Sequence, residues 1–151
     1  MTDVHSKETR SKNMAAVSGK NTKPELLIRK ALHRRGFRYR LHDKNLPGKP
    51  DLVFPKYKAV IFVNGCFWHH HDCHLFTWPS TRKDFWKSKI EANKTRDIEA
   101  IKQLRSMGWR VLTTWECSLK GKSRLPAETL ISIVSNWIVS ETGDQEVRGE
   151  E

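Results

Sequence analysis

Residues 59–74 read AVIFVNGCFWHHHDCH, and we expect the fold to form around them. The first five of these residues are an apolar run that is typical of a buried β-strand. Residues 65–74 hold four histidines, two of the three cysteines in the chain and an adjacent Phe-Trp pair. The stretch therefore predicts a strand that delivers metal ligands, a general base and two large aromatic side chains to one place.

Hydrophobic periodicity on either side of this stretch predicts a mixed α/β protein. Thr22 can cap a helix that runs to about Arg35 and ends at Gly36. Short strands are expected at 37–41, 52–54, 58–63 and 109–115. Helices are expected at about 81–107, in one or two pieces, and at about 126–139. The side chains expected to be buried on the three helices are Leu27, Ile28, Ala31 and Leu32, then Ile98, Ile101 and Leu104, then Leu130, Val134, Trp137 and Ile138.

The basic charge is concentrated in the first third of the chain. The net charge is +11, and residues 1–50 hold 13 Lys and Arg against 4 Asp and Glu, whereas residues 51–151 hold 15 against 13. This asymmetry indicates a surface that binds a polyanion, most simply nucleic acid. A solvated basic surface is the alternative. A membrane is disfavoured as a partner, because the basic half has no Trp- or Phe-rich amphipathic helix.

Three cysteines, two of them beside histidines, favour metal ligation in a reducing compartment over a disulfide framework. The N-terminus lacks the apolar segment of a signal peptide, so we expect a cytoplasmic protein. Cys66, Cys73 and one intervening histidine, with Cys117 from a distant strand, suit a structural Zn²⁺. Spacing alone does not decide which histidine binds; we choose His71, which leaves His69 and His70 for other work. Buried free thiols and exposed histidines are the alternative.

A second group of residues suits a harder cation. Asp51 follows Pro-Gly-Lys-Pro at the start of a short strand, and with Glu25 and a backbone carbonyl at the end of strand 58–63 it would hold Mg²⁺. His69 would then act as the base for metal-assisted hydrolysis of a phosphodiester. The alternative is that Asp51 caps a turn and Glu25 a helix.

Exposed aromatic residues beside cations suggest contact with bases. Phe67 and Trp68 lie within the His/Cys segment, and Trp86 is close to Lys83, Lys87 and Lys89. Such side chains can insert between base steps and unstack them. A small satellite core around the zinc is the alternative.

Several of these segments resemble the very-short-patch-repair (Vsr) DNA mismatch endonucleases. The resemblance is carried by RSKNM at 10–14, LPGKPD at 46–51, GCFWHHH at 65–71, Phe85-Trp86, Lys89, GWRV at 108–111 and WEC at 115–117. It runs from about residue 3 to 139. It implies an α/β fold like that of the type II restriction endonucleases, with a mixed central sheet flanked by helices and a structural zinc site. It also implies a Mg²⁺-dependent nick 5′ of the T in a T·G mismatch, the product of 5-methylcytosine deamination, in very short patch repair.

The resemblance also implies roles for individual residues. Asp51 and the carbonyl of Val63 would bind Mg²⁺, and His69 would be the base, supported by Glu25 and oriented by Asp97. Contacts with DNA are implied for Met14, Phe67, Trp68, Trp86, Lys89 and Asn93. Zinc would be held by Cys66, His71, Cys73 and Cys117. The partner would be double-stranded DNA with a T·G mismatch, bound by a monomer in the bacterial nucleoid.

One position departs from the family. Members often have Thr-His where this chain has Val63-Asn64, and an amide cannot exchange a proton as imidazole does. We expect activity to be retained, with His70 as a substitute if a second imidazole is required.

The sequence and the resemblance together predict three parts of the chain. Residues 1–23 would form a basic arm that clamps DNA, residues 24–140 the endonuclease domain, and residues 141–151 a disordered acidic tail. The rival interpretations are a nuclease of relaxed specificity and a non-catalytic zinc-containing DNA-binding protein.

Overall fold

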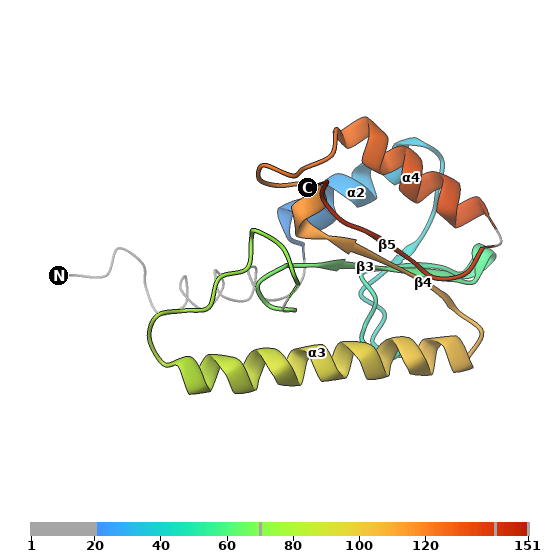
Figure 1. Cartoon of the computed structure of the whole chain (residues 1–151). Coiled ribbons are helices and arrows are strands. Elements are labelled where there is room, and N and C mark those ends of the chain that lie inside the picture. Colours follow the sequence, from blue (N-terminus) through green and yellow to red (C-terminus); the bar gives the residue numbers. More distant parts are fainter. Residues whose placement is uncertain (1–20, 70, 141, 151) are drawn as a thin grey trace, which may run out of the picture.

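A five-stranded mixed β-sheet forms the centre of the protein, as seen in a computed structural model that describes residues 21–69, 71–140 and 142–150. Helices α2 and α4 cover one face of the sheet, and α3 runs along the other (Figure 1). The strands are β1 (Arg40–Leu41), β2 (Leu52–Phe54), β3 (Ala59–Asn64), β4 (Arg110–Trp115) and β5 (Gln145–Val147). The helices are α2 (Lys23–Arg34), α3 (Lys83–Ser106) and α4 (Ala127–Val139), with 3₁₀ turns at Pro55–Tyr57 and Glu116–Ser118. The predicted mixed α/β class is confirmed.

The strand register brings two distant segments together. The strands lie in chain order: β1, β2 and β3 pair antiparallel, while β3, β4 and β5 pair parallel. A parallel β3–β4 pair needs a crossover, and α3 provides it. Asn64 is paired with Trp115 at the last position of both strands. The segments that begin at Gly65 and Glu116 therefore leave the sheet side by side.

Side chains that alternate along the strands point to opposite faces of the sheet, so the core has two layers. Ile28 and Leu32 of α2 and Leu130 and Val134 of α4 pack with one face of the sheet, including Ile61. Val53, Val60 and Val111 point to the other face, where they pack with Leu104 of α3. Thr22 caps α2 as predicted, since its hydroxyl accepts a hydrogen bond from Glu25 N–H at 3.4 Å.

Two of the predicted buried stripes were partly wrong. Leu27 is 39% exposed and Ile98 is 61% exposed. The inward stripe of α2 is instead Glu25, Ile28 and Leu32. On α3, which is one continuous helix, residues at helical spacing face inward, and Asn93 and Asp97 lie among them: Ile90, Asn93, Asp97, Ile101 and Leu104. Polar residues thus occupy some of the inward-facing positions at which the periodicity predicts apolar residues.

Two predictions about strands and ends also need correction. The strand expected at 37–41 is regular only at Arg40–Leu41. The tail expected to be disordered instead contains β5, which pairs with β4 and buries Val147. Asp144 accepts a hydrogen bond from Val111 N–H at 2.9 Å at the start of this pairing. The acidic composition was misleading because β4 had an open edge that needed backbone partners.

Residues 1–20 lie outside the described part of the chain, and so does most of the predicted basic arm, including Met14. Within the described residues, no helix combines the length and the apolar character that crossing a bilayer requires.

Candidate active site

Four cysteine and histidine side chains converge where β3 and β4 end. Cys66 and Cys117 follow the two paired strands, and the loop after Cys66 folds back so that His71 and Cys73 join them. The four potential ligand atoms lie within 4.8 Å of one another. His71 Nδ1 is 3.4 Å from the sulfur of Cys66 and 3.6 Å from that of Cys117. A tetrahedral zinc site separates its ligand atoms by about 3.5–3.8 Å, so the donor set and the spacing both fit Zn²⁺.

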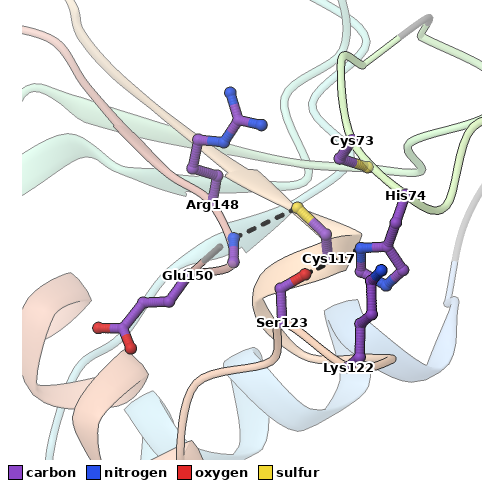
Figure 2. A pocket seen from close by; sticks show the side chains of 8 residues that line it. Cys73, His74, Cys117, Lys122, Ser123, Arg148 and Glu150 are labelled. Carbon is purple, nitrogen blue, oxygen red and sulfur yellow. Dashed lines mark hydrogen bonds between the residues drawn. The ribbon is translucent and has the colours of Figure 1, made fainter.

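The thiols of this cluster are shielded from water. Cys66 is 0% exposed and Cys117 is 1% exposed. Burial raises the pKa of both thiols above the ordinary value, because the thiolate is poorly solvated there. The Gly149 N–H donates to the sulfur of Cys117 at 3.3 Å, and Ser123 and His74 are hydrogen-bonded nearby (Figure 2). These residues border a cavity of about 450 Å³ next to the cluster.

Trp115 connects this cluster to the next part of the site. Its ring stacks on His71, with centroids 4.0 Å apart and planes 5° from parallel. The same ring meets His69 edge-on at 6.3 Å. The indole N–H donates to Glu146 of β5 at 3.2 Å, which holds the ring in place.

His69 belongs to a second centre, on the side of the sheet edge that faces α3. Its Nδ1 contacts the Oδ2 of Asp97. His69, Asp97, Asp51, Val63 and Asn64 line one cavity of about 360 Å³. The predicted proximity of Asp51 and His69 is therefore present in the structure.

Asp51 lines the same cavity, and the buried carboxylate of Glu25 lies behind it. An Oδ2 of Asp51 accepts the Val63 N–H at 2.7 Å. Glu25 is only 1% exposed, and its carboxylate is paired with Arg29 at 2.8 Å. Burial, with a further contribution from the Glu25 charge, raises the pKa of Asp51 to about 7, although the Val63 hydrogen bond opposes this. A cation bound here would favour the ionised carboxylate.

Sequence reasoning missed His42 in this centre. Its Nε2 is 2.8 Å from Oε1 of Glu25 and 3.9 Å from Oδ1 of Asp51. The potential ligand atoms of Glu25, His42 and Asp51 lie within 4.8 Å of one another. The available signal was positional. His42 and Asp51 stand at the two ends of the connection between two short strands, so they would face each other if those strands paired.

The predicted aromatic wedge residues form a cluster of their own. Phe67, Trp68 and Trp86 have ring centroids 5.3 to 5.8 Å apart, and each ring is partly exposed. Phe67 and Trp68 also line a cavity with His69 and Asn64. They therefore border the second centre and are not sealed around the cysteines.

The remaining predicted DNA contacts lie on α3. Asn93 is half-buried and donates from Nδ2 to the carbonyl of Trp68 at 3.1 Å, so it supports the aromatic cluster. Lys89 is exposed on the same helix. Asn64, at the position where the family often has histidine, is 9% exposed and lines the cavity with His69. His70 lies outside the described residues.

Comparisons with known proteins identify the family to which the chain belongs. Residues 2–75 match the family model of DNA mismatch endonuclease Vsr. The chain is 45% identical to the DNA mismatch endonuclease Vsr of Escherichia coli K12 over 147 residues, which covers 97% of this chain and 94% of that protein. It is 48% identical over 127 residues to the type II nicking enzyme V.XorIIP of Xanthomonas oryzae pv. oryzae, covering 84% of this chain and 93% of the relative. A further relative is the type II nicking enzyme V.NmeAIP of Neisseria meningitidis, 46% identical over 82% of this chain and 88% of the relative. The chain therefore belongs to the Vsr family of DNA mismatch endonucleases.

Proposed function

We propose that this protein nicks one strand of duplex DNA 5′ of the T in a T·G mismatch, by metal-dependent hydrolysis, and so starts very short patch repair. The observation that supports this most directly is the single cavity shared by Asp51 and the His69–Asp97 pair. The carboxylate of Asp51, which suits a divalent cation, lies in the same cavity as an oriented imidazole, and the buried Glu25 carboxylate adjoins it. The relatives described as a mismatch endonuclease and as nicking enzymes agree with such chemistry.

The proposed roles follow from the contacts. Asp51 and Glu25, with the carbonyl of Val63, would hold Mg²⁺, which neutralises charge that develops on the phosphate. Asp97 contacts Nδ1 of His69, which leaves Nε2 as the nitrogen that accepts a proton from the attacking water. Asp97 thereby fixes both the tautomer and the direction of the ring.

The aromatic cluster supplies the proposed mismatch dependence. Phe67, Trp68 and Trp86 stand beside the cavity, where they would enter the duplex close to the phosphate that is cut. A T·G wobble pair stacks less well than a matched pair, so unstacking it costs less free energy. Rings that insert between base steps therefore favour the mismatch.

Zinc in the cluster of Cys66, His71, Cys73 and Cys117 has a structural role in this proposal. Four protein ligands leave no open position for a substrate. The ion would fix the loop that carries Phe67, Trp68 and His69. Trp115 would help to position His69, because its ring stacks on His71 and also contacts His69. Salt-sensitive affinity for the backbone would come from the basic N-terminal third and from exposed lysines of α3 such as Lys89.

Single-turnover nicking of labelled duplexes with one T·G pair, compared with matched duplexes, tests the proposal. We expect a single nick 5′ of the T, dependent on Mg²⁺, with no comparable cleavage of matched DNA. Asp51→Ala should abolish nicking while DNA binding persists, and Trp68→Ala should narrow the ratio of mismatched to matched rates. Equal cleavage of matched duplex would instead indicate a relaxed nuclease. Binding without any nicking by the wild-type protein would indicate a non-catalytic DNA-binding protein.

The same assay tests the consequence of Asn64. We expect activity without an imidazole at this position, because His69 and its Asp97 partner are both in place. Asn64→His should change the rate by less than about tenfold if proton transfer at His69 suffices. A gain of several orders of magnitude would show that the natural Asn64 disables the site.

A further inference from the structure

His42 is held against the acidic centre by its own backbone. It follows β1, and Asp51 precedes β2, so the antiparallel pairing of Leu41 with Leu52 puts the two residues opposite each other. The His42 N–H donates to the carbonyl of Asp51 at 3.2 Å. The φ of His42 is +47°, in the left-handed region that few non-glycine residues occupy. The backbone therefore fixes the position of the His42 Cα, to which the imidazole side chain is attached.

The side chain of His42 points into the group of carboxylates. Nε2 lies 2.8 Å from Oε1 of Glu25 and 3.9 Å from Oδ1 of Asp51, and the side chain is 15% exposed. An octahedral cation with ligands at about 2.1 Å separates neighbouring ligand atoms by about 3.0 Å and opposite ones by about 4.2 Å. Both observed separations are close to this range. One ion can thus contact all three residues with small adjustments of the side chains.

The other carboxylate oxygen of Glu25 is already occupied. Oε2 is bound by Arg29 at 2.8 Å, whereas Oε1 is the atom that faces His42. The Asn21 N–H also donates to Oε1, at 3.2 Å. These contacts hold the Glu25 carboxylate in one orientation, so the site is assembled before an ion arrives.

We propose that Nε2 of His42 is a third protein ligand of the cation bound by Glu25 and Asp51, and that this nitrogen gives the site a preference for Mn²⁺ over Mg²⁺. Mg²⁺ is bound in proteins mainly through oxygen atoms, and it gives up its bound water molecules reluctantly. Mn²⁺ shares the preference of Mg²⁺ for oxygen ligands, but as a first-row transition metal it accepts an imidazole nitrogen more readily than Mg²⁺ does. The inference deepens the proposed function, on which it rests for the presence of a catalytic cation in this cavity.

Metal titration of the full chain, with its zinc content measured before and after, tests the preference. Binding of Mn²⁺ is followed by loss of the EPR signal of the free ion, and binding of Mg²⁺ by competition with Mn²⁺. His42→Gln should weaken Mn²⁺ binding by about tenfold or more and Mg²⁺ binding by clearly less, so that the ratio of the two affinities falls. His33→Gln removes an exposed imidazole at the end of α2 and is the matched control, with no expected effect.

A spectroscopic measurement on the wild-type protein does not depend on whether the variant folds. With ¹⁵N-labelled histidine, pulsed EPR of bound Mn²⁺ should show coupling to a directly bound imidazole nitrogen. That coupling should persist in His69→Gln and be absent in His42→Gln. Absence of the coupling in the wild type would overturn the inference, as would an equal loss of Mn²⁺ and Mg²⁺ affinity in His42→Gln, which would make His42 only a hydrogen-bond partner of Glu25.

Nicking of the T·G duplex, measured on the same samples, separates this inference from the proposed function. Wild-type nicking in Mg²⁺ together with an unchanged affinity ratio in His42→Gln would overturn the metal preference and leave the enzyme assignment in place. Metal binding that depends on His42, without nicking in either cation, would support the ligand and overturn the assignment.

Discussion

The two ligand clusters stand at the same edge of the sheet and are built in opposite ways. Cys66, His71, Cys73 and Cys117 provide four soft ligands, and the two cysteines that follow the strands are fully shielded. Glu25, His42 and Asp51 provide hard or borderline ligands, and of the three His42 and Asp51 line a cavity. A closed set of four ligands is typical of a structural ion, whereas a set that leaves positions open is typical of a catalytic one.

The difference extends to how each cluster affects folding. The ligands of the Cys/His cluster come from the loop after β3 and the turn after β4, so an ion there would join two distant parts of the chain. The segment after β5 adds a hydrogen bond from Gly149 N–H to the sulfur of Cys117. The carboxylates of Asp51 and Glu25 lie close together and are poorly solvated, so they cost stability until a cation arrives. In the proposed function, an ion in the first cluster would stabilise the fold, whereas the second cluster would lower the stability of the metal-free protein until its cation binds.

The largest expected effect is from Cys117→Ser, which removes one of the four proposed zinc ligands. We expect loss of bound zinc and a fall in melting temperature of more than about 10 °C, because zinc binding and folding are coupled. Zinc content by mass spectrometry and thermal unfolding by circular dichroism measure both effects. A chelator should lower the melting temperature of the wild type and have little further effect on the variant. A zinc-free variant with the same melting temperature as the wild type would show that the ion is dispensable for the fold.

Asp97→Asn should produce the next largest effect, through the orientation of His69. The amide preserves the size of the side chain but does not hold the imidazole in the same tautomer. We expect the single-turnover nicking rate to fall by about 10- to 100-fold, less than in His69→Ala, which removes the base itself. Affinity for the mismatched duplex should stay unchanged, and Asp97→Glu should recover part of the rate.

Asp84→Asn is the matched control, because it changes an exposed carboxylate in the first turn of the same helix. A fall in DNA affinity in Asp97→Asn, with the rate at saturation preserved, would contradict a positioning role for Asp97.

Asp51→Asn should stabilise the metal-free protein while it abolishes nicking. The pKa of Asp51 is raised from 3.8 to about 7, so the folded state holds a proton that the unfolded state has released. Wild-type stability is therefore expected to decline as the pH rises from about 4 to about 7. The asparagine has no charge to lose, and its carbonyl oxygen can still accept the Val63 N–H. At pH 8 the variant should melt about 3 °C or more above the wild type, and the difference should shrink toward pH 4.

Scanning calorimetry in zinc-containing buffer without Mg²⁺ measures this difference. Added Mg²⁺ or Mn²⁺ should raise the melting temperature of the wild type and leave that of Asp51→Asn almost unchanged. A variant that melts below the wild type at pH 8 would mean that the ionised carboxylate is well stabilised without a cation.

The sequence predicted the fold well wherever apolar periodicity was strong. The strand at Ala59–Asn64 and the helix at Ala127–Val139 were anticipated because dense local patterns predict them. The grouping of Cys66, His71, Cys73 and Cys117 was also anticipated, but local spacing left the choice of histidine open and Cys117 lies on a distant segment. Boundaries and pairing partners were harder. β5 has only three residues, and its formation depends on the open edge of β4, which no local pattern reveals.

The two wrongly predicted buried residues near the candidate site have the same cause. Glu25 on α2 and Asp97 on α3 occupy inward positions that an apolar periodicity assigns to hydrophobic residues. The search for apolar stripes therefore selected Leu27 and Ile98, which are exposed. A buried acidic residue at the spacing of an apolar stripe breaks a folding rule, and such violations are expected at functional sites. His42 lacked even this signal, since its place depends on a two-residue strand and a left-handed backbone.

The smallest expected effect concerns the seal of the sulfur cluster by the C-terminal segment. A Cβ on Gly149 would lie 2.5 Å from the carbonyl oxygen of Cys117 and 2.7 Å from that of Ser123. Both are backbone atoms, so the segment itself must move. The hydrogen bond from Gly149 N–H to the Cys117 sulfur would then lengthen. Gly149→Ala should cost about 1–3 kcal/mol and release zinc faster to a coloured chelator.

Gly143→Ala is the control for this change, because a Cβ there meets no atom within 4 Å. The rates of zinc release from the two variants test whether the C-terminal segment helps to close the Cys/His cluster. If it does, displacing its backbone donor should speed the loss of the ion. Equal release rates in Gly149→Ala and Gly143→Ala would mean that the four ligands alone retain the zinc. The segment after β5 would then complete the sheet without sealing the metal. A faster release in Gly149→Ala alone would instead make β5 part of the zinc site, because the edge strand would then hold the donor against the sulfur.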